Sequence, residues 1–291
     1  MLQLILRIDI FILLFYNIHI SLNKEEFNMK KIIFIGAGNL ATQLSSAMKE
    51  QGYDIIQIYS KSLKNAKILG SSLSCDYTDD LNQIKDTADL YIFSIKDTAL
   101  QECIRSVKPN KALWVHTAGS IPMSVFEPHA KRYGVFYPLQ TFSKNKKVNF
   151  SNIPFFVEAN SEKDATLLTD MALKISQDVR VISSEQRKYI HLAAVFACNF
   201  TNHMYAISEK LLKEHGLPFD ILQPLIQETS DKIKKISPVT AQTGPAVRYD
   251  ENVMNKQLSL LKDDQLKEIY RLLSKNIHAF AINISHEQNK L

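Results

Sequence analysis

The glycine-rich segment at residues 36–41, Gly-Ala-Gly-Asn-Leu-Ala, points most directly to chemistry. It matches the G-x-G-x-x-A pattern by which α/β domains bind dinucleotides: Gly36 would allow a tight turn, Gly38 a close approach of the pyrophosphate, and Ala41 close helix packing. The free N–H groups at the start of that helix would face the phosphates. A strand-turn-helix that merely uses small residues is the alternative. The expected cofactor-binding residues here are Gly36, Ala37, Gly38, Asn39, Leu40 and Ala41.

The end of the second expected strand, residues 54–59, distinguishes between the nicotinamide cofactors. Proteins that bind NAD place an Asp or Glu here, which binds the 2′-hydroxyl of the ribose. This sequence has Ser60, Lys61 and Ser62 instead. Hydroxyl and ammonium groups suit a 2′-phosphate because they donate hydrogen bonds and offset its charge. We therefore expect NADP as the cofactor, with NADPH preferred over NADH; Ser60 would also serve as the cap of a helix expected from Leu63.

Polar residues follow three further expected strands, at residues 90–95, 112–115 and 133–137. Because the carboxyl ends of parallel strands meet at one edge of a sheet, these residues are expected around the ligand. Asp97 is more simply the N-cap of the next helix, which is expected over residues 98–107. The cofactor side is expected to include Ile95, Lys96 and Thr117, and the substrate side Gln140 and Thr141.

His116 directly follows the expected strand at 112–115 and is a candidate catalytic residue. At that strand end it would lie near the nicotinamide, where an imidazole can give or take a proton. A structural histidine bonded to a loop carbonyl explains the residue equally well.

The first helix of the C-terminal half, expected over residues 185–215, carries two more catalytic candidates. His191 and Asn199 lie about 80° apart around such a helix and share one broad face. His191 would exchange the proton that accompanies hydride transfer, and Asn199 would orient the substrate. Satisfied interior hydrogen bonds account for both residues equally well. The apolar residues of this helix, Ala197 and Cys198 among them, are expected to form a buried face.

Residues 243–250, Thr-Gly-Pro-Ala-Val-Arg-Tyr-Asp, form an expected loop whose path Gly and Pro would fix. Arg248 would bind a substrate carboxylate with both ends of its guanidinium group, and Asp250 would help to close the pocket. The two side chains would equally well pair with each other and hold the loop in place.

The elements that position these residues fall into two halves. From residue 31 to 182 strands and helices alternate, which predicts an α/β fold: a Rossmann-type, doubly wound, mostly parallel sheet. From residue 183 onward only helices are expected, over 185–215, 220–235, 250–261 and 264–284. We therefore predict an NADP-binding domain at 29–182 and an all-α domain at 183–291 for substrate binding and dimerisation. Apolar helix faces there would pack against a second subunit and form a homodimer.

The composition excludes several classes of protein. The 291 residues are 45% hydrophobic and 22% charged, with a net charge of +5, as in ordinary globular chains. No basic stripe with interleaved aromatic residues indicates nucleic acid. Three cysteines without a C-x-x-C pair predict no metal site and no disulfide framework, and suit a reducing, cytoplasmic location.

Residues 1–28 do not follow the pattern of the rest. Their apolar run is too short and too interrupted by polar residues for a membrane span, and it lacks the features of a signal peptide. Met29 leads directly into the first strand. We expect a leader outside the fold, with a membrane anchor as the alternative, and no membrane contact for the remainder.

Four motifs together resemble a known family: HTAGS at 116–120, YPLQTFS at 137–143, HLAAVFACNF at 191–200 and TGPAVRYD at 243–250. They are similar to Rossmann-like proteins that carry a helical C-terminal domain of unknown function 2520. The wider group resembles pyrroline-5-carboxylate reductases, deazaflavin-dependent NADP reductases and 6-phosphogluconate-dehydrogenase-like enzymes. The resemblance covers residues 29–284 and implies a helical domain that often completes the site across a dimer.

The resemblance supplies no substrate, and one feature departs from the wider group. The β-hydroxyacid dehydrogenases place a Lys and an Asn four residues apart on the corresponding helix. Here Leu192 follows Lys188, and Val195 follows His191, at that spacing. The catalytic chemistry of those enzymes therefore does not transfer unchanged to this chain.

The leading hypothesis is an NADP(H)-dependent oxidoreductase that acts on a small carbonyl, imine or hydroxy compound. A non-catalytic sensor of NADP(H) is the alternative, because it needs the glycine motif but not His191. A methyltransferase that binds adenosylmethionine is a weaker rival, since the Gly36-x-Gly38 spacing and the Ser60–Lys61 strand end disfavour it.

Overall fold

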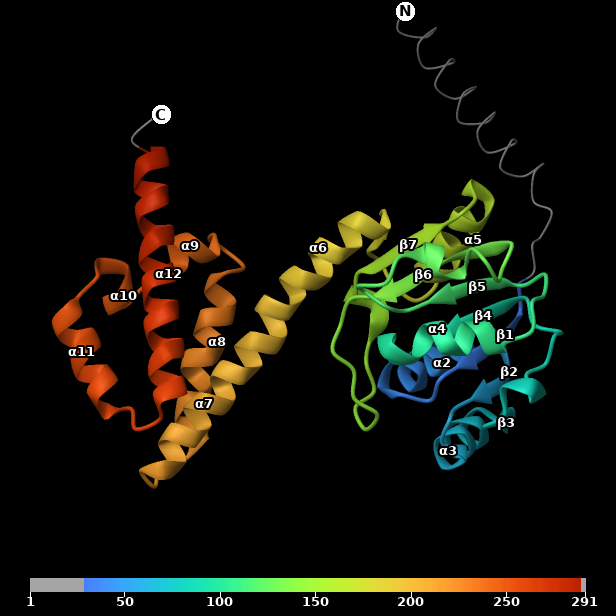
Figure 1. Cartoon of the computed structure of the whole chain (residues 1–291), viewed down its shortest axis with the longest axis horizontal. Coiled ribbons are helices and arrows are strands. Elements are labelled where there is room, and N and C mark those ends of the chain that lie inside the picture. The colour runs from blue at the N-terminus through green and yellow to red at the C-terminus, as the bar shows by residue number, and fades with distance from the viewer. Residues whose placement is uncertain (1–28, 289–291) are drawn as a thin grey trace, which may run out of the picture. The chain divides into compact units, whose positions relative to one another are not determined.

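A computed structural model describes residues 29–288 of the chain (Figure 1). Contacts divide the chain into two compact units, Met1–Phe200 and Thr201–Leu291. We call them the sheet unit and the helical unit and describe each by itself. The leader predicted over residues 1–28 lies outside the described residues. The predicted domain division at residues 182 and 183 followed secondary structure rather than contacts, and it stays a prediction.

The sheet unit contains an eight-stranded sheet in the order β3-β2-β1-β4-β5-β6-β7-β8. All neighbouring strands are parallel except β6 and β7, which are antiparallel. This architecture confirms the predicted Rossmann-type α/β fold. The strands are β1 (Lys31–Ile35), β2 (Asp54–Tyr59), β3 (Asp76–Thr78), β4 (Leu90–Phe93), β5 (Leu113–His116), β6 (Arg132–Pro138), β7 (Phe155–Ala159) and β8 (Val179–Val181).

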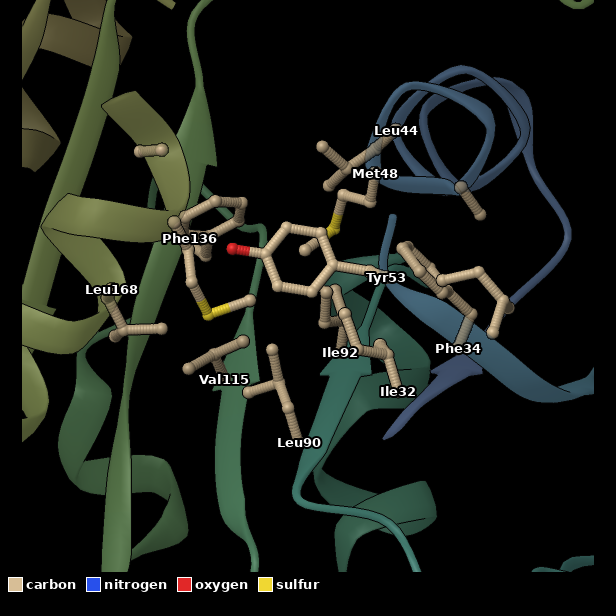
Figure 2. Close-up of a cluster of buried hydrophobic side chains, with 14 of the residues drawn as sticks. Ile32, Phe34, Leu44, Met48, Tyr53, Leu90, Ile92, Val115, Phe136 and Leu168 are labelled. Atoms are coloured by element: carbon tan, nitrogen blue, oxygen red, sulfur yellow. The ribbon is translucent and has the colours of Figure 1, made fainter. Parts of the chain in front are cut away.

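Helices cover both faces of the sheet, which explains why the central strands read as continuous apolar runs. On one face, α2 (Asn39–Glu50), α3 (Leu63–Leu73) and α5 (Glu162–Leu173) pack on the strands. Figure 2 shows this cluster, in which Leu44 and Met48 of α2 and Leu168 of α5 lie among strand side chains. On the other face, α4 (Asp97–Ser106) and the 3₁₀ helix η2 (Met123–Phe126) cover a second cluster around Trp114.

Two helix caps differ from the sequence prediction. Ser62, not Ser60, caps α3, and its Oγ accepts a hydrogen bond from the N–H of Asn65. Lys96, not Asp97, is the N-cap residue of α4, so Asp97 begins the helix with its carboxylate available for other bonds. The capping preferences of Ser and Asp identify the segment in which a helix begins, but they do not decide which of two nearby residues is the N-cap. That choice depends on the path of the backbone after the strand.

The predicted helix at 185–215 is interrupted at the boundary between the units. It consists of α6 (Ser184–Ala194), a π-helical turn (Val195–Phe200) and α7 (Thr201–Glu214). The predicted buried face is wrong for Ala197 and Cys198, which lie in the π turn and are exposed. A π turn adds one residue per turn and rotates the helix face, so a regular 3.6-residue period misassigns the residues in it.

The helical unit continues with shorter elements. They are η5 (Phe219–Leu222), α8 (Gln223–Lys232), α9 (Pro238–Ala241), α10 (Pro245–Arg248), α11 (Glu251–Leu260) and α12 (Asp264–Gln288). The predicted helices at 220–235, 250–261 and 264–284 correspond to α8, α11 and α12. The short helix α10 lies in the segment 243–250 that was expected to be a loop, and α9 lies just before it, where no element was predicted. Within the described part of the chain, none of the helices has both the length and the apolar content to cross a membrane.

Candidate functional site

A cleft of about 1160 Å³ lies at the carboxyl ends of the parallel strands of the sheet unit. It gathers segments that lie far apart in the sequence: the glycine turn after β1, the ends of β2 and β4, and the loop after β5. All but one of the cofactor-binding residues expected from sequence line it. The exception, Ala41, is fully buried beneath the cleft, where its small side chain lets α2 pack on the sheet.

The two glycines of the motif have different physical roles. Gly36 has φ of +128°, and a Cβ there would come within 2.1 Å of the carbonyl oxygen of Ser94. The fold itself therefore requires Gly36. Gly38 has an ordinary φ of −79°, and apart from Gly38 and its two chain neighbours no residue has an atom within 4 Å of the position of its absent Cβ. Since the protein does not need a glycine there, the open space beside it fits a ligand that approaches the backbone.

The first helix offers its backbone to that space. Gly38 is the N-cap residue of α2 and supplies no side-chain bond, and the first turn contains no acidic residue. The N–H groups of the first turn therefore keep their hydrogen-bonding capacity for an anion, which the helix dipole also favours. A diphosphate fits this position chemically.

The loop between β6 and β7 is fastened onto α2. Asn39 donates from Nδ2 to the carbonyl oxygen of Phe142 at 2.8 Å, and Gln43 donates from Nε2 to that of Ser143 at 2.9 Å. Gln43 also accepts from the N–H of Val148. These bonds bring Lys144 into the lining of the cleft. Asn39, expected beside the cofactor, thus also holds the loop that supplies Lys144, one of the three lysines in the lining.

The end of β2 forms one wing of the cleft. Ser60, Lys61 and Ser62 all line it, together with Asn65 of α3. The first turn of α3 has no acidic residue either. Donors from side chains and from a helix start thus converge here, although Asp79 after β3 adds one carboxylate to the lining.

The opposite wall follows β4 and includes Ile95, Lys96 and Asp97. Asp97 accepts a hydrogen bond from Oγ of Ser120 at 2.5 Å, which joins the loop after β4 to the loop after β5. Cys103 also lines this wall. Burial raises the pKa of its thiol to about 12, so it is a neutral thiol rather than a nucleophilic thiolate at physiological pH.

His116 is fully buried and lies outside the lining of the cleft. Its Nδ1 accepts a hydrogen bond from the N–H of Ala118 at 3.1 Å, so the imidazole fixes the start of the loop. Burial, reinforced by the nearby charge of Arg187, lowers the pKa of His116 to about 3. In this environment it is a neutral residue that supports the loop, and its predicted catalytic role stays a prediction.

His191 lies against the loop after β5 in the sheet unit. A Cβ on Gly119 would come within 2.5 Å of its Nδ1, so only glycine allows the loop and the imidazole to come this close. The hydroxyl of Tyr137, at the end of β6, is 3.0 Å from the same Nδ1. Gly119 directly follows Thr117 and Ala118, which line the cleft. The imidazole is thus joined to the wall of the cleft through one short loop.

A buried ion pair sets the position of α6 and hence of His191. Arg187, one helical turn before His191, is fully buried and donates from Nη1 to Glu158 of β7 at 2.5 Å. Glu158 also accepts from the N–H and the Oγ of Ser184. Breaking a buried pair of this kind typically costs ~3–5 kcal/mol, because one charge is left uncompensated. The start of α6 is therefore firmly fixed to the sheet.

The remaining predicted residues lie elsewhere. Gln140 and Thr141 are exposed and outside the lining of the cleft, and Oε1 of Gln140 accepts from the N–H of Thr141. Asn199 lies exposed in the π turn. Arg248 and Asp250 belong to the helical unit, where Asp250 caps α11 through the N–H of Val253. No ion pair joins these two residues, both of which lie in the described region.

Sequence reasoning assigned no role to several residues that the structure brings to the site. Tyr137 belongs to a motif that was noted, but only the fold places its hydroxyl against His191. Lys144 lies in a lysine-rich loop far from the glycine motif. The side-chain amides of Asn39 and Gln43 lie one helical turn apart, and this spacing is the sequence feature that could have indicated a loop bound to the start of α2.

The parallel sheet, the glycine turn at its carboxyl edge and the open start of α2 define a Rossmann-type dinucleotide-binding domain. Comparison with known proteins agrees with this class. Residues 31–116 match the family described as NADP oxidoreductase, coenzyme F420-dependent. Residues 153–277 match a domain of unknown function, DUF2520.

Solved structures extend the likeness over both units. A protein from Bacteroides fragilis, described provisionally as an NADP oxidoreductase, is 50% identical with a TM-score of 0.81; the match covers 86% of this chain and 98% of that one. A pyrroline-5-carboxylate reductase from Coxiella burnetii is 16% identical with a TM-score of 0.53, covering 88% and 98%. A reductive aminase from Aspergillus terreus, in complex with NADPH and ethyl-5-oxohexanoate, is 9% identical with a TM-score of 0.66, covering 86% and 93%.

The chain therefore belongs to the family in which an NADP-oxidoreductase-type Rossmann domain is followed by DUF2520. This confirms the resemblance drawn from the four sequence motifs. The two more distant structures share the fold alone. No protein of curated function matches the chain.

Proposed function

We propose that this protein is an NADP(H)-dependent oxidoreductase that acts on a small carbonyl, imine or hydroxy compound. The observation that carries the proposal is the open space beside Gly38, which the protein itself does not require and which lies at the free start of α2. Family membership and the NADPH bound to the reductive aminase support it. When bound, NADPH supplies the hydride; the residues of the chain bind, orient and exchange the proton.

The cofactor is expected to lie along the cleft in a definite direction. Its diphosphate would receive hydrogen bonds from the first turn of α2, and Lys144 would offset part of its charge. Its 2′-phosphate would lie between Lys61 and Ser62, near the start of α3, which supports a preference for NADPH over NADH. Its nicotinamide would point toward Ile95, Lys96 and Thr117.

The substrate side is expected to begin where the loop after β5 meets His191. We propose His191 as the residue that exchanges a proton with the substrate, with Asn199, in the π turn that follows α6, as an orienting group. Gln140, Thr141, Arg248 and Asp250 complete the proposed substrate-binding set.

We also propose that the protein functions as a homodimer formed through the helical unit. Large apolar side chains there are exposed in the single chain; they include Leu225, Leu260, Leu272 and Phe280. Surfaces of this kind mark sites of association, and closed two-fold dimers are the commonest result. We further expect a cytoplasmic protein.

Calorimetric titration with NADPH and NADH tests the proposal. The wild-type protein should bind NADPH more tightly than NADH. Gly38→Val should weaken NADPH binding by at least about tenfold, because its side chain fills the space for the diphosphate, while the protein stays folded and loses only about 1 kcal/mol of unfolding free energy from a less favourable N-cap. A well-folded wild-type protein that binds neither nucleotide would exclude the function. Binding without NADPH oxidation against a panel of carbonyl and imine compounds would favour the sensor alternative.

A further inference from the structure

The contact between Tyr137 and His191 is not explained by nucleotide binding. Neither residue lines the cleft, yet a phenol hydroxyl and an imidazole nitrogen approach to 3.0 Å at the loop that forms its end. Gly119 makes this arrangement possible, because any side chain there would collide with the imidazole. The two residues come from different elements, β6 and α6, so the contact is a product of the tertiary fold.

The surroundings of Tyr137 decide the direction of this hydrogen bond. Tyr137 is buried, and burial raises the pKa of its phenol, so the hydroxyl keeps its proton at neutral pH. His191 Nδ1 is its hydrogen-bond partner among the described residues. If the hydroxyl accepted a hydrogen bond from Nδ1, its own O–H would have no acceptor among the described residues, which buried side chains rarely tolerate. Donation from Tyr137 to Nδ1 is the arrangement that pairs both groups.

This direction fixes the tautomer of His191. A neutral imidazole carries one proton, so when Nδ1 is an acceptor the proton lies on Nε2. Nε2 is bonded to none of the described residues, and it is not among the described nitrogen atoms that are sealed from solvent without a partner. His191 is thus held on one side of its ring and has a free N–H on the other.

We propose that Tyr137 is the positioning residue of this site: its hydroxyl holds His191 in the Nε2–H tautomer, and His191 gives that proton to the oxygen of a small neutral aldehyde or ketone. The inference deepens the proposed function and rests on it. A carbonyl oxygen has a lone pair that accepts from Nε2–H, whereas the nitrogen of a protonated imine, the form that receives a hydride most readily, has none. The pair therefore favours a carbonyl compound over a protonated imine within the broader class.

The proton transfer balances through the pair. As the carbonyl carbon receives a hydride with its two electrons, the π electrons of the C=O bond move to the oxygen, which takes the proton from Nε2. Nδ1 takes the phenol proton of Tyr137, and the pair resets when Nδ1 returns that proton to the phenolate while Nε2 takes a proton from water. The net reaction consumes one carbonyl group, one hydride from NADPH and one proton from water, and it forms an alcohol. Burial of Tyr137 disfavours the transient phenolate, and the positive charge of Arg187 offsets part of that effect.

Nuclear magnetic resonance of ¹⁵N-histidine-labelled full-length protein tests the tautomer without any turnover. The His191 signals, assigned by their loss in His191→Gln, should show the Nε2–H form in wild type. Tyr137→Phe removes only the hydroxyl and should shift the signals toward a mixture of tautomers. Tyr133→Phe, on the same strand, is the matched control and should leave them unchanged. An Nδ1–H tautomer in wild type, or an unchanged spectrum in Tyr137→Phe, would overturn the inference.

Steady-state kinetics with NADPH and separate panels of aldehydes, ketones and cyclic imines test the chemistry. Tyr137→Phe should lower kcat for the carbonyl substrates about tenfold, the weight of one hydrogen bond, with KM much less affected and NADPH affinity unchanged. Activity on imines alone would overturn the substrate class. Absence of NADPH binding in wild type would instead refute the proposed function, while the tautomer measurement would still decide the role of Tyr137.

Discussion

The sheet unit and the helical unit differ in how much of their own apolar surface the single chain covers. The three buried hydrophobic clusters found among the described residues all lie in the sheet unit. Among the described residues of the helical unit only Ala246, Met254 and Ser274 are buried, while Leu260 and Leu272 are 77% and 70% exposed. The sheet unit is thus a self-contained fold, whereas the helices have the amphipathic pattern of a buried structure without a complete core.

This difference shows that amphipathic periodicity predicts which side chains form the apolar face of a helix. It does not predict which surface covers that face. In the sheet unit the partner surface is the sheet itself, which two helical layers cover. In the helical unit we propose that the partner is a second copy. The largest effect is expected from a substitution in the sheet unit, because this unit is stabilised by contacts within the single chain.

Gly36→Val should destabilise the sheet unit by about 4 kcal/mol, because a positive φ strains any side chain and its Cβ would overlap the carbonyl oxygen of Ser94. Urea unfolding monitored through Trp114, which lies in this unit, measures the change. Gly38→Ala is the matched control, since it has an ordinary φ and no neighbour near its Cβ, and it should change stability little. If the two variants were equally stable, the fold would not require a glycine at position 36.

Charges on the exposed face of α12 should disrupt the proposed dimer. The double change Leu272→Glu and Phe280→Glu would bury carboxylates in an apolar interface, so the dimer dissociation constant should rise about 100-fold or more. Sedimentation velocity measures it. Ile68→Glu, at an equally exposed apolar residue of the sheet unit, is the control and should leave the dimer intact. A wild-type protein that is monomeric at tens of micromolar would rule out the proposed dimer through the helical unit.

Acid should weaken the sheet unit through His116. Its folded pKa is about 3, below the unfolded value near 6.5, so only the unfolded state takes up the proton between these values. The contribution of neutral His116 to the free energy of unfolding is therefore fully present above pH 6.5, and it is lost as the pH falls toward 3. Between pH 7 and pH 5 the residue should cost about 2 kcal/mol of unfolding free energy. Urea titrations at both pH values should give a smaller difference for His116→Gln, and an identical difference would contradict this account.

The smallest effect concerns cofactor choice at the edge of the sheet unit. Lys61→Ala should weaken NADPH binding about tenfold through the loss of one charge-assisted contact with the 2′-phosphate, and it should leave NADH affinity unchanged. Calorimetry with both nucleotides measures the ratio. Lys64→Ala, on α3 outside the lining of the cleft, is the control. A parallel loss for both cofactors would place the contact of Lys61 on another part of the nucleotide.

The sequence by itself determined the Rossmann-type fold and the main segments that line the cleft. Residues 36–41, the end of β2 and the loops after β4 and β5 are local signals: each needs only a strand, a turn and a helix start, and parallel strands bring their carboxyl ends to one edge. Ala41 fits the same rule as the packing residue beneath the turn.

Tertiary structure alone decided the contacts between distant elements. The meeting of Tyr137 with His191, the docking of the loop at Lys144 through Asn39 and Gln43, and the burial of His116 depend on how β6, α6 and α2 pack. No periodicity encodes such pairs, because each requires two segments to be placed in three dimensions first. The π turn at Val195–Phe200 escaped prediction for a related reason: a regular period contains no information about an inserted residue.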